Sequence, residues 1–165
     1  MSNLTDISDV IIIGSGPAGL SAAIYVVRAG LSVNVIEKEF MGTGQIADSS
    51  KVDNYLGIPA ISGYDLGESF REHALSLGVT IEDNNVTRLT PVDDIWELEL
   101  SDGSTKKARC VIYAAGCSHK KLQAENEEQY TGKGISYCAV CDGAFYKDKD
   151  VAVVGGGDTA LSDAL

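Results

Sequence analysis

Two cysteines separated by two residues, with a carboxylate directly after the second, form the most chemically reactive pattern in this sequence. They are Cys138, Cys141 and Asp142. The spacing lets the two sulfurs close a small disulfide ring, and a helix start nearby would favour the thiolate form. Asp142 stands next to Cys141, where it can move the protons that thiol–disulfide exchange requires. The pattern therefore predicts a redox-active dithiol.

Zinc binding and an inert cysteine pair are the alternatives. A structural zinc site normally has a second pair of ligands at a characteristic spacing. Neither Cys110 with Cys117 nor Cys117 with His119 has that spacing. The sequence therefore favours redox chemistry, and no metal site is expected.

A glycine-rich turn near the amino terminus has the pattern that binds dinucleotides. A continuous apolar run, Val10–Ile13, precedes it, as is typical of a parallel strand buried on both faces. Gly14 permits a tight turn, Gly16 lets the backbone approach a pyrophosphate, and Gly19 lets the following helix pack closely on the strand. The whole turn comprises Gly14, Ser15, Gly16, Pro17, Ala18 and Gly19.

An acidic residue closes the strand that should follow this helix. Glu37 lies about 20 residues after the turn, where its carboxylate can accept hydrogen bonds from ribose hydroxyls, and Lys38 follows it. A solvated strand end is the alternative for Glu37. Because strand, turn, helix, strand and acid occur in this order, the sequence favours a nucleotide site over a simple glycine turn.

The last residues of the chain repeat the strand–glycine–helix pattern. An apolar segment, Val151–Val154, leads into a G-x-G-x-x-A turn, which predicts a second nucleotide site. These residues do not distinguish NADH from NADPH. The expected binding residues here are Gly155, Gly157, Asp158, Thr159 and Ala160.

The elements that must position these residues follow from periodicity and turn signals. Helices are expected over Pro17–Gly30 and Tyr64–Leu77, and a loop over Met41–Pro59. A hairpin turn is expected at Ser101–Ser104. Strands are expected over Leu31–Glu37, Val79–Glu82, Val86–Thr90, Ile95–Leu100 and Lys107–Tyr113.

Composition excludes several other classes of protein. The 165 residues are enough for one ordinary domain and too few for two full dinucleotide-binding domains. A formal net charge of −11 disfavours binding to nucleic acid or anionic lipid. Val10–Ile13 is far shorter than a membrane span, and the leader Met1–Asp9 is acidic and polar. We expect a cytoplasmic protein whose partners are proteins or cofactors.

The order of these motifs resembles that of low-molecular-weight, bacterial-type thioredoxin reductases over essentially the whole chain. In that family, FAD is also contacted by a Gly-Gln loop and by an Asn-aromatic-x-Gly segment. These match Gly44 with Gln45, and the segment that begins at Asn54. The Ala-Thr-Gly at the end of the family's meander is matched by Ala114, Ala115 and Gly116.

The resemblance implies roles for the reactive residues. Cys141 would lie against the flavin, Cys138 would attack the substrate disulfide, and Asp142 would be the general acid or base. It also implies FAD and NADPH as cofactors, thioredoxin or a thioredoxin-like protein as substrate, and a homodimer. Family members are about twice this length, so the chain resembles their amino-terminal half. The other half would include the rest of the nicotinamide domain and a segment that returns to finish the FAD site.

Several residues depart from the family pattern. Thr43 stands for the first Gly of Gly-Gly-Gln, Leu56 for Pro, and Ala115 for Thr. Ser162 and Asp163 stand where the family has two acidic residues, which leaves ferredoxin as a second candidate for the electron donor. A flavoprotein of a peroxiredoxin system and a non-catalytic FAD-domain fragment are two further hypotheses for the function.

The expected fold is α/β, with a three-layer Rossmann-like FAD-binding domain made of a parallel sheet and a β-meander over Val86–Tyr113. We assign residues 1–116 to this domain, 117–149 to a connection that carries the dithiol, and 150–165 to the truncated start of a Rossmann-like nicotinamide domain. Residues 151–165 should be the least well packed. The remaining polar and aromatic residues of note are expected to be structural: His73 packed or solvated, His119 exposed to solvent, Cys110 in the core, Trp96 and Tyr113 packed in the meander, and Glu125–Glu128 solvated.

Overall fold

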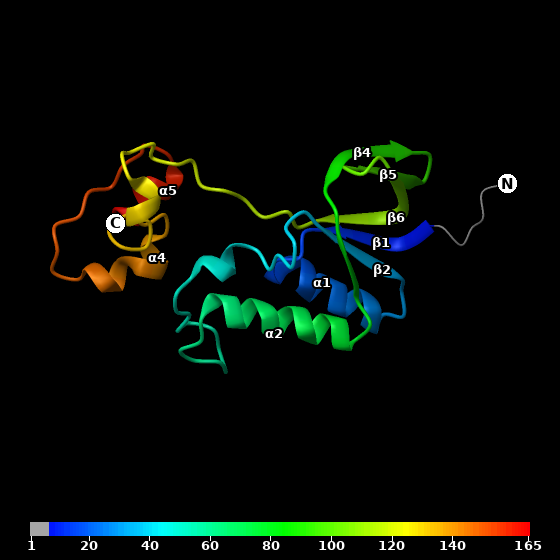
Figure 1. Ribbon diagram of the computed structural model, residues 1–165, viewed down its shortest axis with the longest axis horizontal. Coiled ribbons are helices and arrows are strands. Elements are labelled where there is room, and N and C mark those ends of the chain that lie inside the picture. Colours follow the sequence, from blue (N-terminus) through cyan, green and yellow to red (C-terminus); the bar gives the residue numbers. More distant parts are fainter. Residues whose placement is uncertain (1–6) are drawn as a thin grey trace. The chain divides into compact units, whose positions relative to one another are not determined.

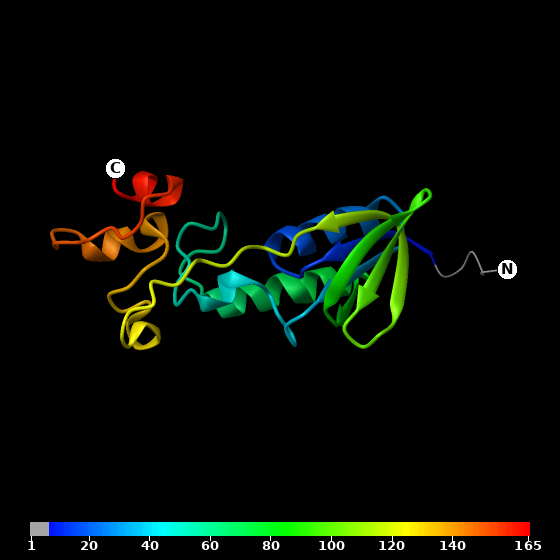
Figure 2. The same ribbon diagram turned by 90° about the horizontal axis from the view of Figure 1, so that it is seen from above.

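The computed structural model describes residues 7–165, apart from the side chain of Val140. Residues 1–6 of the leader therefore lie outside the described residues. The chain divides into two compact units, Met1–Gly116 and Cys117–Leu165. The first unit is a sheet with two long helices, and the second consists of short helices joined by irregular segments (Figures 1 and 2).

The first unit is built on one six-stranded sheet in the order β3-β2-β1-β6-β5-β4. Strands β3, β2, β1 and β6 are parallel, whereas β4, β5 and the first half of β6 form an antiparallel meander. This confirms the expected α/β fold. The strands are β1 (Ile7–Ile13), β2 (Val33–Glu37), β3 (Thr80–Asp83), β4 (Val86–Val92), β5 (Ile95–Leu100) and β6 (Thr105–Tyr113).

Alternation of side chains along β1 produces three layers, because neighbouring residues point to opposite faces of the sheet. Val10 and Ile12 pack with the helices α1 (Pro17–Arg28) and α2 (Gly63–Ser76). Ile11 packs with the meander on the other face. Figure 1 shows the two helices on one side of the sheet and β4 and β5 on the other. The continuous apolar run thus marks a strand that is buried on both faces.

Strand β6 has paired neighbours on both edges only at Lys107 and Ala108. Strand β5 pairs with β6 as far as Ala108, whereas β1 pairs with it as far as Tyr113. Beyond Ala108, no strand within residues 7–165 pairs with the second edge. Cys110 and Tyr113 lie in this second part of the strand and are exposed, so the expectations that Cys110 lies in the core and that Tyr113 packs in the meander were wrong. Trp96 does pack in the meander cluster.

The second unit lacks the strand that was expected over Val151–Val154. These residues have no regular secondary structure, and Val151 and Val154 are 69% and 68% exposed. A buried parallel strand needs hydrogen-bonding neighbours and covered faces, and the described part of this unit supplies no strand. Residues 151–165 are poorly packed, as expected, but they are not the least well packed part, because residues 115–126 are exposed throughout. The unit's helices are α3 (Glu127–Tyr130), α4 (Ala139–Asp142), the 3-10 helix η3 (Gly143–Tyr146) and α5 (Asp158–Asp163).

The long loop of the first unit is partly ordered by contact with α2. It contains the 3-10 helix η2 (Gln45–Asp48), which packs on α2. Just before η2, Thr43 is buried against Gly67 of α2, where an added Cβ would lie 2.8 Å from Thr43 Cβ. A side chain at position 43 therefore requires glycine at position 67.

We expect Gly67→Ala to lower the free energy of unfolding by about 1–2 kcal/mol, because overpacking costs more than the helix gains from alanine. The measurement is urea unfolding of the chain. In the double variant Thr43→Gly with Gly67→Ala, the loss should largely disappear. Ser69→Ala, at a position of the same helix outside its buried face, is the matched control. An unchanged or higher stability for Gly67→Ala alone would show that Thr43 does not constrain α2.

Candidate functional site

Two glycines of the amino-terminal turn are required by contacts within the protein. Gly14 has a φ of +103°, and a Cβ there would overlap the carbonyl oxygen of Ala114. A Cβ on Gly19 would overlap the carbonyl oxygen of Gly14. These contacts bring α1 against β1 and place the end of β6 beside the turn, so the packing role predicted for Gly19 is visible directly.

Gly16 has no such requirement. Its φ of −66° suits any residue, and an added Cβ would lie 3.8 Å from the nearest atom, Cα of Gly44. The turn is open here, because Pro17 and Ala18 are exposed. The first turn of α1 has no acidic residue and no side-chain cap. Its free N–H groups and positive dipole end favour an anion, so this turn fits the pyrophosphate of a dinucleotide.

Glu37 is buried beside the turn at the end of β2. Its Oε2 accepts hydrogen bonds from the backbone N–H and the hydroxyl of Ser15, over 2.7 and 2.8 Å. Its Oε1 accepts one from the Glu39 N–H over 3.0 Å. Burial by itself raises the pKa of Glu37, but the hydrogen bonds from Glu39 and Ser15 outweigh it and hold the pKa below its usual value. The Lys38 N–H also hydrogen-bonds to this carboxylate, so a ribose hydroxyl would have to share one of its acceptor positions.

Because its pKa is lowered in the folded state, Glu37 stabilises the fold above its unfolded pKa of about 4.3, and this contribution is lost as the pH falls through the folded pKa. We expect Glu37→Gln to lower the free energy of unfolding by about 1–3 kcal/mol near neutral pH, because the amide N–H₂ cannot accept a hydrogen bond. Denaturant unfolding at neutral and acidic pH should show the difference shrinking below about pH 4. Glu39→Gln, at an exposed position, should have little effect. A difference independent of pH would contradict this account.

Three of the other residues expected to hold the cofactor lie against the same turn. Gly44, at a φ of +79°, approaches so closely that an added Cβ would lie 3.1 Å from Cα of Gly16. Ala114 and Ala115 border Gly14. Asn54 is exposed on a separate loop, whose next residue, Tyr55, lies against the ring of Phe70 with centroids 5.3 Å apart. Three further expected residues, Lys38, Gln45 and Gly116, are exposed.

The two cysteines of the second unit form a disulfide. Cys138 and Cys141 are bonded through their sulfurs, with Cα atoms 5.3 Å apart. Cys138 caps the amino terminus of α4, and its Sγ accepts a hydrogen bond from the Cys141 N–H over 3.2 Å. After reduction, this N–H would stabilise negative charge on the Cys138 sulfur. That arrangement suits a nucleophile at Cys138.

Two further polar side chains lie around the disulfide: Ser136, which the sequence patterns did not single out, and Asp163, which they noted only as a departure from the family pattern. Ser136 donates a hydrogen bond to Asp142 Oδ2 over 2.6 Å. Asp163 of α5 lies 3.4 Å from the Ala139 N–H at the start of α4. The sequence feature that could have pointed to Ser136 is its position two residues before Cys138, close to the short helix α4 that ends at Asp142.

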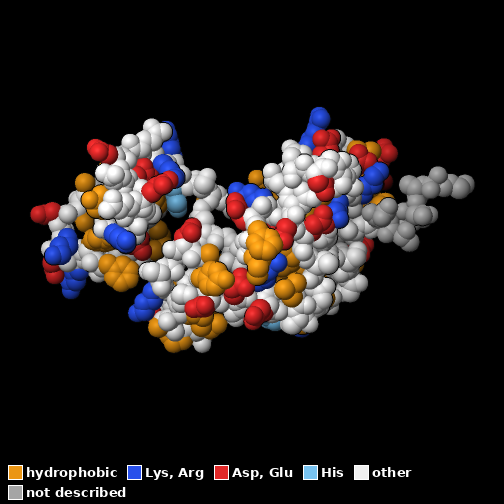
Figure 3. All heavy atoms as spheres, in the orientation of Figure 1, with side chains coloured by type: hydrophobic (Ala, Val, Ile, Leu, Met, Phe, Trp, Pro, Cys, Tyr) orange, Lys and Arg blue, Asp and Glu red, His pale blue; other side chains and the backbone are white. Residues whose placement is uncertain are grey.

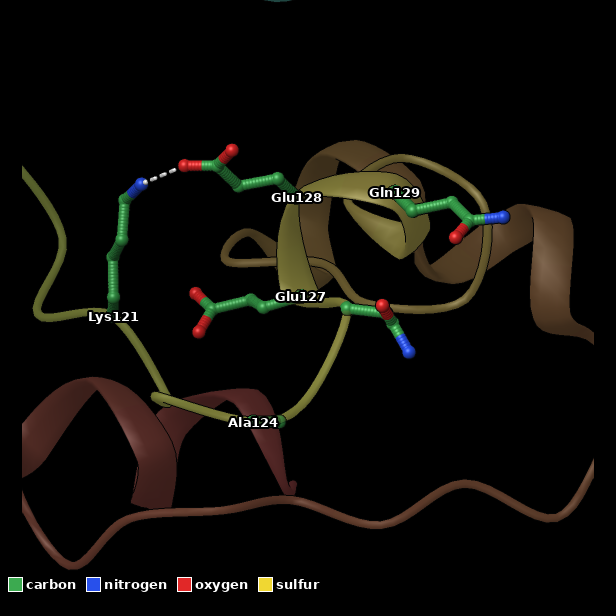
Figure 4. Close-up of a pocket in the computed structure, with 6 residues that line it drawn as sticks. Lys121, Ala124, Glu127, Glu128 and Gln129 are labelled. Carbon is green, nitrogen blue, oxygen red and sulfur yellow. Dashed lines mark hydrogen bonds and ion pairs between the residues drawn. The ribbon is translucent and has the colours of Figure 1, made fainter.

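A buried carboxylate anchors the segment that leads to Cys138. Glu127 accepts hydrogen bonds from the Gln123 N–H over 2.6 Å and from the Tyr137 hydroxyl. The bond from Tyr137 holds the pKa of Glu127 below its usual value and raises the pKa of Tyr137. Figure 4 shows Glu127 beside the ion pair of Lys121 with Glu128, whose charged atoms are 3.1 Å apart. The expectation of a fully solvated run at residues 125–128 was therefore wrong for Glu127.

The second glycine turn is only partly built. Gly155 has a φ of +141°, and α5 starts at Asp158, after Gly157. Thr159 is exposed and Ala160 half-buried. The structure thus forms the turn and the helix start but not the strand before them, which a Rossmann nucleotide site also needs.

Metal-binding clusters and membrane-spanning helices are both absent from the described residues. Among them, no group of three or more His, Cys, Asp or Glu side chains is arranged to hold a metal ion. None of the helices within residues 7–165 combines the length and apolar character needed to cross a membrane.

Comparison with known proteins identifies relatives. The family model for pyridine nucleotide-disulphide oxidoreductases matches residues 8–165. Thioredoxin reductase of Bacillus subtilis is 44% identical over 161 residues, which cover 96% of this chain and 50% of that protein. The crystal structure of thioredoxin reductase from Streptococcus pyogenes has a TM-score of 0.88 at 40% identity, covering 96% of this chain and 51% of that one.

A ferredoxin-flavin thioredoxin reductase from Clostridium acetobutylicum has a TM-score of 0.65 at 36% identity, covering 96% of this chain and 54% of that one. The chain thus spans about half the length of the proteins it matches. The family match over nearly all of the described residues, together with the fold and the disulfide, shows that the chain belongs to the pyridine nucleotide-disulphide oxidoreductase family.

Proposed function

We propose that this chain supplies the flavin site and the redox-active disulfide of an FAD-dependent thioredoxin reductase. One observation carries the proposal: the same chain holds the Cys138–Cys141 disulfide and a glycine turn in which no contact within the described residues requires Gly16. A glycine that the fold does not need is explained by a ligand that approaches its backbone.

The residues of the first unit fit FAD. The turn at Gly16 and the free N–H groups of α1 would hold the pyrophosphate, and Glu37 would accept from the ribose. Gly44 and Gln45, Asn54, and Ala114–Gly116 would contact the rest of the cofactor, as the family resemblance implies. Bound FAD supplies two-electron transfer to a disulfide.

The residues of the second unit would pass the electrons to a protein disulfide. After reduction, the Cys138 thiolate attacks a partner disulfide and forms a mixed disulfide, and Cys141 then attacks Cys138 Sγ and releases the partner. Asp142 moves the proton between these steps. The N–H of Cys141, which points at Cys138 Sγ over 3.2 Å, supports Cys138 as the attacking sulfur.

NADPH is the proposed electron donor and thioredoxin the proposed substrate. The test is oxidation of NADPH by the protein at the length of its relatives, with thioredoxin disulfide as acceptor. Turnover with a peroxiredoxin-reducing protein and none with thioredoxin would move the assignment to a peroxiredoxin system. A purified protein without visible flavin absorbance would instead indicate a non-catalytic fragment.

Ferredoxin is the second candidate donor. Ser162 and Asp163 replace the family's acidic pair, and a solved relative is a ferredoxin-flavin thioredoxin reductase. In the second unit the Asp163 carboxylate accepts a hydrogen bond from the Ala139 N–H at the start of α4, so this side chain contacts the helix that carries the disulfide. Reduction of the flavin by reduced ferredoxin but not by NADPH would favour this candidate.

A cytoplasmic homodimer completes the proposal. Hydrophobic side chains remain on the surface of the first unit over α1 and α2 (Figure 3). A cavity of about 440 Å³ there is lined by Leu20, Ile24, Tyr25 and Phe70, among others. Exposed apolar surface of this kind supports association with a second copy, and sedimentation of the flavin-loaded protein would measure it.

A further inference from the structure

A serine hydroxyl joins the two ends of the disulfide helix. Ser136 Oγ accepts a hydrogen bond from the Cys138 N–H over 3.1 Å and donates one to Asp142 Oδ2 over 2.6 Å. The same oxygen lies 3.2 Å from the Cys138 carbonyl oxygen. A hydroxyl has a single proton, and a carboxylate is the stronger acceptor, so the proton belongs on the side of Asp142.

This bond limits where the Asp142 carboxylate can point. An unrestrained aspartate side chain samples several staggered rotamers, and a charge-assisted hydrogen bond selects one of them. Ser136 is itself held by the Cys138 N–H. The carboxylate is therefore fixed relative to the backbone of the first cysteine of the disulfide.

We propose that Ser136 is a positioning residue for proton transfer during disulfide exchange at Cys138 and Cys141. The inference rests on the proposed function, in which Asp142 is the acid or base. In the resolving step, Cys141 gives its proton to Asp142 and its sulfur attacks Cys138 Sγ of the mixed disulfide. The Cys138–Cys141 bond forms, the bond from Cys138 to the partner sulfur breaks, and the electron pair leaves on the partner thiolate.

The experiment uses the reduced chain and the aromatic disulfide 5,5′-dithiobis(2-nitrobenzoate), whose thiolate product is coloured. Cys110 and Cys117 are exposed and are first replaced by serine. One thiolate is then released when Cys138 attacks and a second when Cys141 resolves. We expect Ser136→Ala to slow the second release about tenfold, because Asp142 without a fixed orientation removes the Cys141 proton less efficiently. Ser136→Thr keeps the hydroxyl and should restore the rate.

A double-variant cycle separates this role from a structural one. If Ser136 acts through Asp142, Ser136→Ala should add no further slowing to Asp142→Asn. Ser104→Ala is the matched control, because Ser104 Oγ also donates to an aspartate, Asp102 Oδ1, over 2.7 Å, in the β5–β6 hairpin. That variant should leave both releases unchanged.

Three results would overturn the inference: an undiminished effect of Ser136→Ala in the Asp142→Asn background, no rescue by threonine, or equal slowing of both releases. The assay needs no flavin. Coupling of Ser136 to Asp142 in a protein that never binds FAD would therefore refute the proposed function while supporting this inference. Flavin binding without coupling between Ser136 and Asp142 would refute this inference and leave the proposed function standing.

Discussion

In the flavin-loaded protein, Cys138→Ser is expected to produce a long-wavelength charge-transfer band, and Cys141→Ser is expected to produce none. The free Cys141 left in the first variant can donate thiolate density to oxidised flavin, if it is the sulfur that faces the cofactor. The second variant keeps only the sulfur that faces the substrate. The absorbance spectrum of each purified variant is the measurement, with Cys110→Ser as a control that should match wild type.

The same two variants should also differ in their reaction with thioredoxin, where Cys141→Ser is the variant that responds. Cys138 in Cys141→Ser should trap the partner as a mixed disulfide, because no resolving thiol remains. Both variants should lose turnover. The reverse pattern of spectrum and trapping would exchange the roles of the two cysteines, whereas bound zinc with no spectral change in either variant would overturn the redox assignment.

Alanine at Gly16 should abolish tight FAD binding and leave the fold intact. An added Cβ meets no protein atom closer than 3.8 Å, so the free energy of unfolding should change by only about 0.5 kcal/mol. The same Cβ would occupy the space through which a pyrophosphate approaches the backbone. We expect FAD affinity to fall on the order of 100-fold, as measured by fluorescence titration of the apoprotein.

Gly19→Ala gives the contrasting result in the same turn. Its Cβ would overlap the Gly14 carbonyl oxygen, so unfolding should become easier by about 3 kcal/mol or more. If the Gly16 variant bound FAD as tightly as wild type, the pyrophosphate assignment would be wrong. Equal destabilisation by both substitutions would show that Gly16 serves packing instead.

Local patterns predicted most elements of the first unit because apolar periodicity, turn residues and glycine spacing each act within a few residues of the chain. The apolar run before Gly14 became the central strand, and the turn at Ser101–Ser104 became the β5–β6 hairpin. Gly14 and Gly19 could be assigned from spacing, since the tight turn needs a positive φ at Gly14, and the helix start leaves no room for a Cβ between Gly19 and the Gly14 carbonyl oxygen.

The errors arose where the outcome depends on partners distant in sequence or outside the described residues. Val151–Val154 has the composition of a buried strand, but the second unit offers it no neighbouring strand among its described residues. Cys110 lies on an apolar strand that β5 pairs only as far as Ala108. Glu127 belongs to an acidic run and is nevertheless buried, because Tyr137 and backbone N–H groups surround its carboxylate. A sequence pattern does not contain these contacts.

The most direct test of the proposed redox system is a reductive titration of the flavin-loaded protein under anaerobic conditions. If flavin and the Cys138–Cys141 disulfide exchange electrons, the protein should take up about four electrons per chain, two for each group. The double variant Cys138→Ser with Cys141→Ser should take up about two. Uptake of only two electrons by the unmodified protein, with the disulfide still intact afterwards, would contradict the claim that the two groups exchange electrons.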